Sequence, residues 1–181
     1  MVLKYVLKHQ IGAILKIALK QSMLFRRIVM GGKICSFFGH RTIKYENFIR
    51  LELFRIIENL ITEEGYDTFI FGGFSEFDKL CHQIVTELKR KYHFVRRVFC
   101  LIEEKHMTKK PSFLVDEEYE GFAYYTLKFD YWYTRIYYRN CEIIKNSDFI
   151  IFYAEERQNS GAFKALKFAI KNKSNFINLY R

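Results

Sequence analysis

Three short segments of this 181-residue sequence combine small residues with groups that can hold an anion. Gly39-His40-Arg41 places an arginine, which can donate two parallel hydrogen bonds to a phosphate or carboxylate, beside a glycine that lets a ligand approach the backbone. Gly72-Gly73-Phe74-Ser75 and Asn159-Ser160-Gly161-Ala162 are rich in small residues, against which a phosphate or ribose can lie. Together the three segments predict a site for a phosphorylated ligand.

Each segment lies between a short apolar run and a stretch with helical periodicity. Strands are expected at 34–38, 68–71, 98–102, 121–127, 148–153 and 176–179, and helices at 45–64, 77–88, 135–146 and 162–170. This alternation is typical of an α/β fold with an open, mainly parallel sheet and helices on both faces. Ligands of such sheets bind at the carboxyl ends of the strands, where the strand order reverses. The three segments are therefore expected to converge on one crevice.

The helix expected after Gly73 has a recognisable start in Ser75-Glu76-Phe77-Asp78. The hydroxyl of Ser75 and the carboxylate of Asp78 can each accept a hydrogen bond from a free amide of the first turn. A nucleophile elbow would read G-x-S-x-G, and Phe77 stands where the second glycine is needed. Ser75 is therefore interpreted as a helix cap and not as a nucleophile. The strand-to-helix position of Gly72 and Gly73 also predicts an anion site at this helix N-terminus.

Arg139 and Asn140 lie in the helix expected at 135–146. Asn140 shares a helical face with Ile136 and Ile143, so a polar amide interrupts an apolar stripe. A buried amide needs a hydrogen-bond partner. Two roles fit: Asn140 pins a neighbouring loop, or it reaches the ligand crevice.

The formal net charge of +10 is unevenly distributed. Residues 1–33 contain seven basic residues and no acidic ones, whereas the remainder is nearly balanced, with 23 basic and 20 acidic residues. The clusters Lys89-Arg90-Lys91 and Arg96-Arg97 fall at expected element ends and are interpreted as solvated. The body therefore lacks the basic face of a nucleic-acid reader.

Four cysteines, Cys35, Cys81, Cys100 and Cys141, lie far apart in the sequence. They have neither C-x-x-C spacing nor paired histidines, so neither a metal site nor a disulfide framework is expected. They are interpreted as small buried hydrophobic residues in a protein of the reducing cytoplasm.

Residues 2–28 predict a basic amphipathic helix. It lacks the apolar length of a membrane span and the pattern of a secretory signal, so contact with a membrane surface, a polyanion or a partner is the expected role. Alternatively, Met30-Gly31-Gly32-Lys33 is the natural start, and residues 1–29 are not part of the native protein. The expected organisation is an N-terminal segment at 1–32 and one domain at 33–181, with no internal repeat.

From Lys33 to Tyr180 the sequence resembles the SLOG superfamily, a Rossmann-like group that includes the DNA-processing protein DprA and the Lonely Guy enzymes. Its bacterial YspA-type branch is the most similar. The resemblance is carried by 35–41, 69–78, Arg139-Asn140, Asn146-Ser147-Asp148 and Ser160-Gly161-Ala162. It implies a Rossmann-like domain that binds a nucleotide or nucleotide-derived ligand as a sensor or carrier. The ligand-facing residues that it implies are Gly39, His40, Arg41, Gly72, Gly73, Asp78, Arg139, Asn140, Ser160 and Gly161.

Lonely Guy enzymes cleave the glycosidic bond of nucleoside monophosphates with a P-G-G-x-G-T-x-x-E motif. The corresponding residues here, 158–165, lack its threonine and its glutamate. For the alternative of a nucleotide glycosidic-bond hydrolase, Asp78 or Glu120 would have to replace that carboxylate, and His40 or Asp78 would handle protons. No metal and no cofactor are expected.

The third alternative is a scaffold or nucleic-acid-associated protein, favoured by the basic N-terminal segment. Aromatic residues are dense in the last third of the chain, at Tyr131, Trp132, Tyr133, Tyr137 and Tyr138. They are expected either to form a face for homo-oligomer formation or to stack on the base of the ligand.

Overall fold

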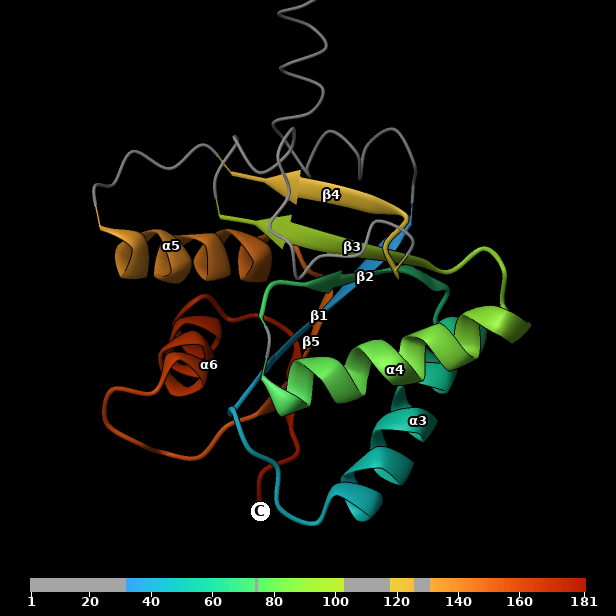
Figure 1. Cartoon of the computed structure of the whole chain (residues 1–181), viewed down its shortest axis with the longest axis horizontal. Coiled ribbons are helices and arrows are strands. Elements are labelled where there is room, and N and C mark those ends of the chain that lie inside the picture. Colours follow the sequence, from blue (N-terminus) through green and yellow to red (C-terminus); the bar gives the residue numbers. More distant parts are fainter. Residues whose placement is uncertain (1–31, 74, 103–117, 126–130) are drawn as a thin grey trace, which may run out of the picture.

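A computed structural model describes residues 32–73, 75–102, 118–125 and 131–181, and this part of the chain contains one sheet and four helices (Figure 1). The helix expected at 2–28 and the end of the strand expected at 121–127 lie outside the described residues. Within these ranges, no helix has the length and hydropathy that a membrane span needs.

All six strands run parallel, in the order β4-β3-β2-β1-β5-β6. Their bounds are β1 (Lys33–Gly39), β2 (Tyr66–Phe71), β3 (Arg96–Leu101), β4 (Gly121–Tyr124), β5 (Phe149–Tyr153) and β6 (Phe176–Asn178). The chain adds strands on one side of β1 up to β4, then returns to the other side for β5 and β6. The predicted α/β fold with an open parallel sheet is confirmed, and its strand order reverses between β1 and β5.

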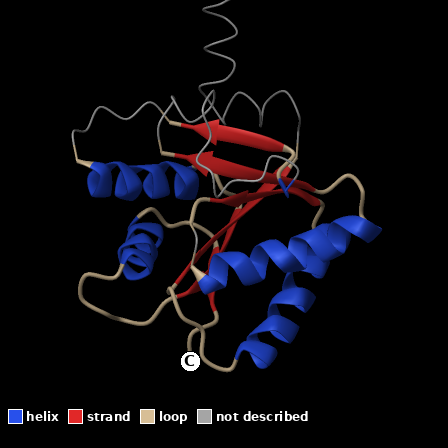
Figure 2. Ribbon diagram, in the orientation of Figure 1, coloured by secondary structure: helices blue, strands red, loops and turns tan. Residues whose placement is uncertain are grey.

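Two helices cover each face of the sheet (Figures 1 and 2). They are α3 (Glu46–Thr62) and α4 (Glu76–Lys91) on one face, and α5 (Trp132–Lys145) and α6 (Gly161–Lys171) on the other. α5 starts three residues before the predicted helix, because its first turn is aromatic and exposed and shows no apolar periodicity. The arrangement is that of a Rossmann-like sheet.

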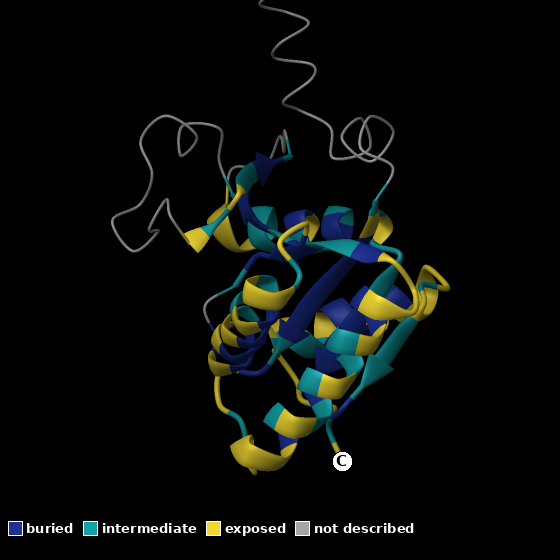
Figure 3. Cartoon of the chain, turned by 90° about the vertical axis from the view of Figure 1, so that its right-hand side faces the viewer, coloured by how far each residue is buried: buried dark blue, intermediate teal, exposed yellow. Residues whose placement is uncertain are grey.

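The central strands β1, β2, β3 and β5 are largely buried on both sides, as the dark blue centre of Figure 3 shows. Phe37 stacks between Phe69 and Phe71 on the face covered by α3 and α4, with ring centroids 6.1 and 5.2 Å away. On the opposite face, Phe38 stacks on Phe152 beside α6. All four cysteines are buried with free thiols, as predicted. These apolar layers fix where the ends of the strands lie.

The basic clusters at the end of α4 and the start of β3 are not simply solvated, which corrects the interpretation of the sequence. Arg97 is buried and donates to both carboxylate oxygens of Glu120, with NH2 2.8 Å from Oε1 and Nε 3.2 Å from Oε2. Lys89 donates to the carbonyl oxygen of Val95 at 2.7 Å. These bonds hold the amino ends of β3 and β4, at the edge of the sheet opposite the three glycine-containing segments.

Two leucines of α3 test the assignment of the core. Leu53→Ala removes a side chain that is 0% exposed, and we expect it to lower the free energy of unfolding by about 3 kcal/mol. Leu51→Ala makes the same chemical change at a side chain that is 63% exposed, and a change within about 0.5 kcal/mol is expected. Urea titrations of both variants measure the difference, and equal losses would contradict this core.

Candidate functional site

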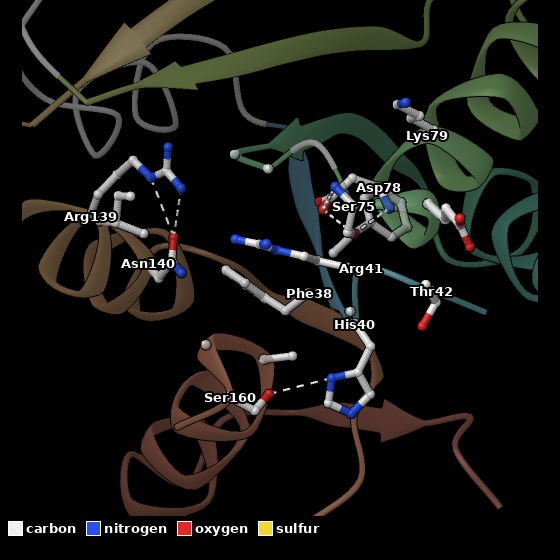
Figure 4. Close-up of a pocket in the computed structure, with 18 of the residues that line it drawn as sticks. Phe38, His40, Arg41, Thr42, Ser75, Asp78, Lys79, Arg139, Asn140 and Ser160 are labelled. Atoms are coloured by element: carbon white, nitrogen blue, oxygen red, sulfur yellow. Dashed lines mark hydrogen bonds between the residues drawn. The ribbon is translucent and has the colours of Figure 1, made fainter. Parts of the chain in front are cut away.

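A pocket of about 930 Å³ lies at the carboxyl ends of the central strands, where the strand order reverses (Figure 4). Its wall comes from the ends of β1, β2 and β3, from α5 and from the loop between β5 and α6. All the ligand-facing residues that the sequence predicted line this one pocket, namely Gly39, His40, Arg41, Gly72, Gly73, Asp78, Arg139, Asn140, Ser160 and Gly161. The three glycine-containing segments therefore converge.

The glycine at the end of β1 has a different role from the predicted one. A Cβ on Gly39 would lie 2.3 Å from the ring of Phe77, which is fully buried, so the glycine makes room for α4 and not for a ligand. Two residues later, Arg41 is exposed, and its side chain extends across the pocket toward α5 in Figure 4. Only the backbone carbonyl of Arg41 is used, as it accepts from the amide of Glu76 at 3.0 Å. Its guanidinium makes no hydrogen bond or ion pair with a described residue and can contact a ligand.

Most of the free amides at the N-terminus of α4 are used by neighbouring residues of the protein. The Ser75 hydroxyl accepts from the amide of Asp78 at 3.0 Å, and Oδ2 of Asp78 accepts from the amide and the hydroxyl of Ser75. The capping box and the role of Ser75 are as predicted. However, the amides of Ser75, Glu76 and Asp78 are all occupied within the protein. The amide of Phe77 has no hydrogen-bond partner in the described part of the chain, so the anion site expected at this helix start stays a prediction, with fewer free donors than the sequence suggested.

Gly73 makes room for the carboxyl group of Asp78, and Gly72 lies in contact with the guanidinium of Arg139. A Cβ on Gly73 would lie 2.5 Å from Oδ2 of Asp78, and a Cβ on Gly72 would lie 3.4 Å from the guanidinium of Arg139. Burial raises the pKa of Asp78 from 3.8 to about 6, although the hydrogen bonds from Ser75 and the charge of Arg139 act in the opposite direction. The pocket therefore holds a carboxyl group that gains a proton close to neutral pH.

The N-terminus of α6, in contrast, is open. Ser160 caps the helix by accepting from the amide of Phe163 at 3.2 Å. The amides of Gly161 and Ala162 have no hydrogen-bond partner in the described part of the chain, and nothing lies within 4 Å of a Cβ built on Gly161. Free amides and the positive end of the helix dipole make this turn suitable for an anion.

His40 holds the loop that leads to α6. Its Nε2 accepts from the amide of Glu155 at 2.8 Å, so the neutral ring carries its proton on Nδ1 and donates to the hydroxyl of Ser160 at 3.3 Å. Burial lowers the pKa of His40, the charge of Arg157 acts in the same direction, and Glu155 opposes both. Because both ring nitrogens are occupied, His40 positions the loop and is not arranged to move a proton.

Arg139 and Asn140 present polar groups to the pocket from α5. Asn140 accepts from Nε and NH2 of Arg139 at 3.3 and 3.0 Å, and NH1 of Arg139 donates to the carbonyl oxygen of Cys100 at 3.3 Å. Of the two roles predicted for Asn140, the structure favours the second, since its side chain reaches the crevice and orients the buried arginine.

Several residues that sequence reasoning missed also line the pocket. Lys79 and Arg157 add positive charge, while Phe38, Leu101 and Ile102 add an apolar wall. The apolar residues gave no signal because every buried strand ends in such residues. Lys79 directly follows Asp78 in the sequence, and Arg157 lies in the loop before Ser160. Their closeness in sequence to predicted site residues could have identified them.

Two sequence-based alternatives for other groups do not hold at this pocket. Glu120 lies with Arg97 at the opposite edge of the sheet and cannot supply a carboxylate. None of the five aromatic residues of α5 and its N-cap lines the pocket, so they do not stack on a ligand there; they are exposed instead, as Tyr131, Trp132, Tyr133, Tyr137 and Tyr138. Among the described residues, no cluster of three or more His, Cys, Asp and Glu side chains could hold a metal ion.

Comparison of the chain with models of known protein families finds no match, and comparison with curated proteins finds no significant match.

The pH dependence of stability tests whether His40 is neutral in the folded protein, where its ring is hydrogen-bonded to Glu155 and Ser160. Between its lowered pKa in the folded state and 6.5, the unfolded chain binds more protons at this residue, so its contribution to stability falls as the pH falls through that window. We expect the difference in free energy of unfolding between wild type and His40→Gln to shrink from pH 7.5 to pH 5, because glutamine can accept and donate without titrating.

Urea titrations across this pH range provide the measurement, and taking the difference removes the contribution of Asp78, which has the opposite sign. His93→Gln, at an exposed histidine outside the pocket, is the matched control. Parallel curves for wild type and His40→Gln would show that His40 is not held neutral.

Proposed function

We propose that this protein binds a nucleotide or nucleotide-derived ligand in the pocket described above and acts as a sensor or carrier. The observation that carries the proposal is the convergence of two arginines, Arg41 and Arg139, with the open first turn of α6 at the reversal of the strand order. Guanidinium groups and free helix amides are the donors that proteins use for phosphate. Their common pocket makes a phosphorylated ligand the best fit.

The remainder of the wall suits the nucleoside. Phe38, Leu101, Ile102 and Ile136 provide apolar surface beside the polar groups, and such a mixture is typical of small-molecule sites. The volume of about 930 Å³ is at the upper end of the range for such sites. A base can lie against the apolar wall while its phosphate reaches the donors.

Binding without turnover is favoured because the groups that could react are already used. The hydroxyl of Ser75 caps α4, the hydroxyl of Ser160 caps α6, and both nitrogens of His40 are hydrogen-bonded. None of the three is paired as a nucleophile with a general base. A sensor or carrier needs only the donors.

Ligand-induced stabilisation tests the binding function. We expect adenine or guanine nucleotides at 100 times their Kd to stabilise the folded protein by about 2.7 kcal/mol, seen as a rise in Tm. Arg41→Gln should weaken binding at least tenfold, because a charge-assisted hydrogen bond to the phosphate is lost.

Arg55→Gln is the matched control, since Arg55 is exposed on α3 and does not line the pocket. Isothermal titration calorimetry gives the affinities. The absence of any shift with nucleotides at millimolar concentration, or equal losses in the two variants, would count against the proposal.

A glycosidic-bond hydrolase is the second candidate, and the observation that favours it is Asp78. A carboxyl group with a pKa of about 6 is protonated often enough near neutral pH to act as a general acid, and it lies in the same pocket as Arg41 and Arg139. In this reaction, Asp78 would protonate the leaving base while Arg41 holds the phosphate.

Release of free base from nucleoside monophosphates separates the two candidates. For a hydrolase, Asp78→Asn should reduce the rate at least 100-fold, since general acid catalysis contributes about 10² to 10⁴. The asparagine oxygen can still accept from the amide of Ser75, so the cap is retained. Chromatography of the reaction mixture measures the base, and no release by wild-type protein from any common nucleotide removes this candidate.

A further inference from the structure

The guanidinium of Arg139 is a buried positive charge on which Asp78 acts only at longer range, without a direct hydrogen bond or ion pair between the two described side chains. The residue is 4% exposed, and its hydrogen bonds go to neutral oxygens only, those of Cys100 and Asn140. It forms no ion pair with any residue that the structure describes. Burying an unpaired charge is costly unless a partner of opposite sign is supplied. Since this guanidinium lines the pocket, a bound anion can be that partner.

Arg139 also lies in a defined place along the edge of the sheet. Its NH1 donates to the carbonyl of Cys100 in β3, and its NH2 lies 3.4 Å from a Cβ built on Gly72, just after β2. This distance is ordinary van der Waals contact, so the guanidinium packs against the backbone that follows β2. The guanidinium of Arg139 is thus the first set of donors, and it lies at the ends of β2 and β3.

A second set of donors stands over the neighbouring strands. The hydroxyl oxygen of Ser160 accepts from the amide of Phe163 and from Nδ1 of His40, which leaves its proton free to be donated. The amides of Gly161 and Ala162 are open beside it. These donors lie in the segment that follows β5, and the hydrogen bond between His40 and Ser160 connects them to the end of β1.

The two sets are too far apart for one phosphate group. Strands in a sheet are about 4.8 Å apart, so sites over β2–β3 and over β1–β5 are separated by roughly two spacings, about 10 Å. Charge-assisted hydrogen bonds to phosphate oxygens are about 2.8 Å long. In Figure 4, Arg41 extends into the space between Ser160 and the pair formed by Arg139 and Asn140. It can therefore assist at either site.

The lining of the pocket carries a net positive charge. Four cations face two acidic residues, namely Arg41, Lys79, Arg139 and Arg157 against Glu76 and Asp78. Of these, Arg157 already pairs with Glu155 at 2.6 Å. Three cations then stand against two carboxyl groups, an excess of one positive charge that rises to two where Asp78 is protonated, and this excess favours a negatively charged ligand.

We propose that the pocket holds its ligand by two phosphate groups, one on Arg139 and Asn140 and one on Ser160 and the first turn of α6. Nucleotides with two phosphates are thus preferred over monophosphates. This inference rests on the proposed function and adds the class of ligand to it.

The test compares three adenosine nucleotides by calorimetry: the 5′-monophosphate, the 5′-diphosphate and the 3′,5′-bisphosphate. We expect at least one of the two doubly phosphorylated compounds to bind tenfold or more tightly than the monophosphate. A preference for the diphosphate indicates adjacent phosphates, and a preference for the bisphosphate indicates phosphates on separate positions of the ribose. The guanosine series is measured in parallel.

Asn140→Asp is the decisive variant. Its carboxylate keeps the oxygen that accepts from Arg139 and supplies the missing negative charge from within the protein. The expected result is an unchanged or higher Tm, because the buried cation gains a partner, together with loss of the preference for two phosphates. Asn47→Asp adds the same charge at an exposed residue of α3 and should change neither the Tm nor the preference for two phosphates.

If Asn140→Asp fails to fold, Arg139→Met replaces the charge by an apolar chain, a change that buried cations often tolerate, and should also abolish the preference. Equal affinities of all three nucleotides for wild type, or a preference that persists in these variants, would overturn the inference while leaving the proposed function in place. Failure of every nucleotide to bind would instead overturn both.

Discussion

The pairing of β1 with β2 on one side and with β5 on the other is the constraint on which the remainder of the structure depends. After β4 the chain must return past β1, so the loops that follow β1 and β5 diverge toward helices on opposite faces of the sheet. The space between these loops is the pocket. This reversal brings the residues considered for ligand binding to one pocket, although local helix caps fix the positions of Asp78 and Ser160 within their turns.

Two helices begin at the pocket, and their first turns have opposite properties. In α4 the capping box of Ser75 and Asp78 uses some of the free amides, and it introduces a carboxylate where an anion would otherwise bind. In α6 Ser160 uses one amide only, and Gly161 keeps the turn accessible. The phosphate donors are therefore concentrated on α6 and α5, while α4 provides Asp78, the one buried acid among the described residues.

The site also contains polar groups that organise each other before any ligand arrives. His40 and Ser160 fix the loop after β5, Asn178 holds the backbone of Ala154 through two hydrogen bonds, and Asn140 orients Arg139. Such preorganisation reduces the entropy that binding would otherwise cost. It also explains why polar side chains are tolerated in a region that is largely buried.

The sequence by itself determined the elements, their α/β alternation and the capping box at Ser75. These properties follow from periodicity and from neighbours a few residues away, so they are local. The convergence of the three glycine-containing segments was expected from a general rule for parallel sheets, but the strand order brings it about. The tertiary structure alone decided that Phe77 fills the space beside Gly39, that Glu120 pairs with Arg97, and that Arg139 has no ion pair among the described residues. These depend on contacts between distant residues, such as His40 with Ser160, 120 positions apart, and no local pattern encodes which side chain will meet which.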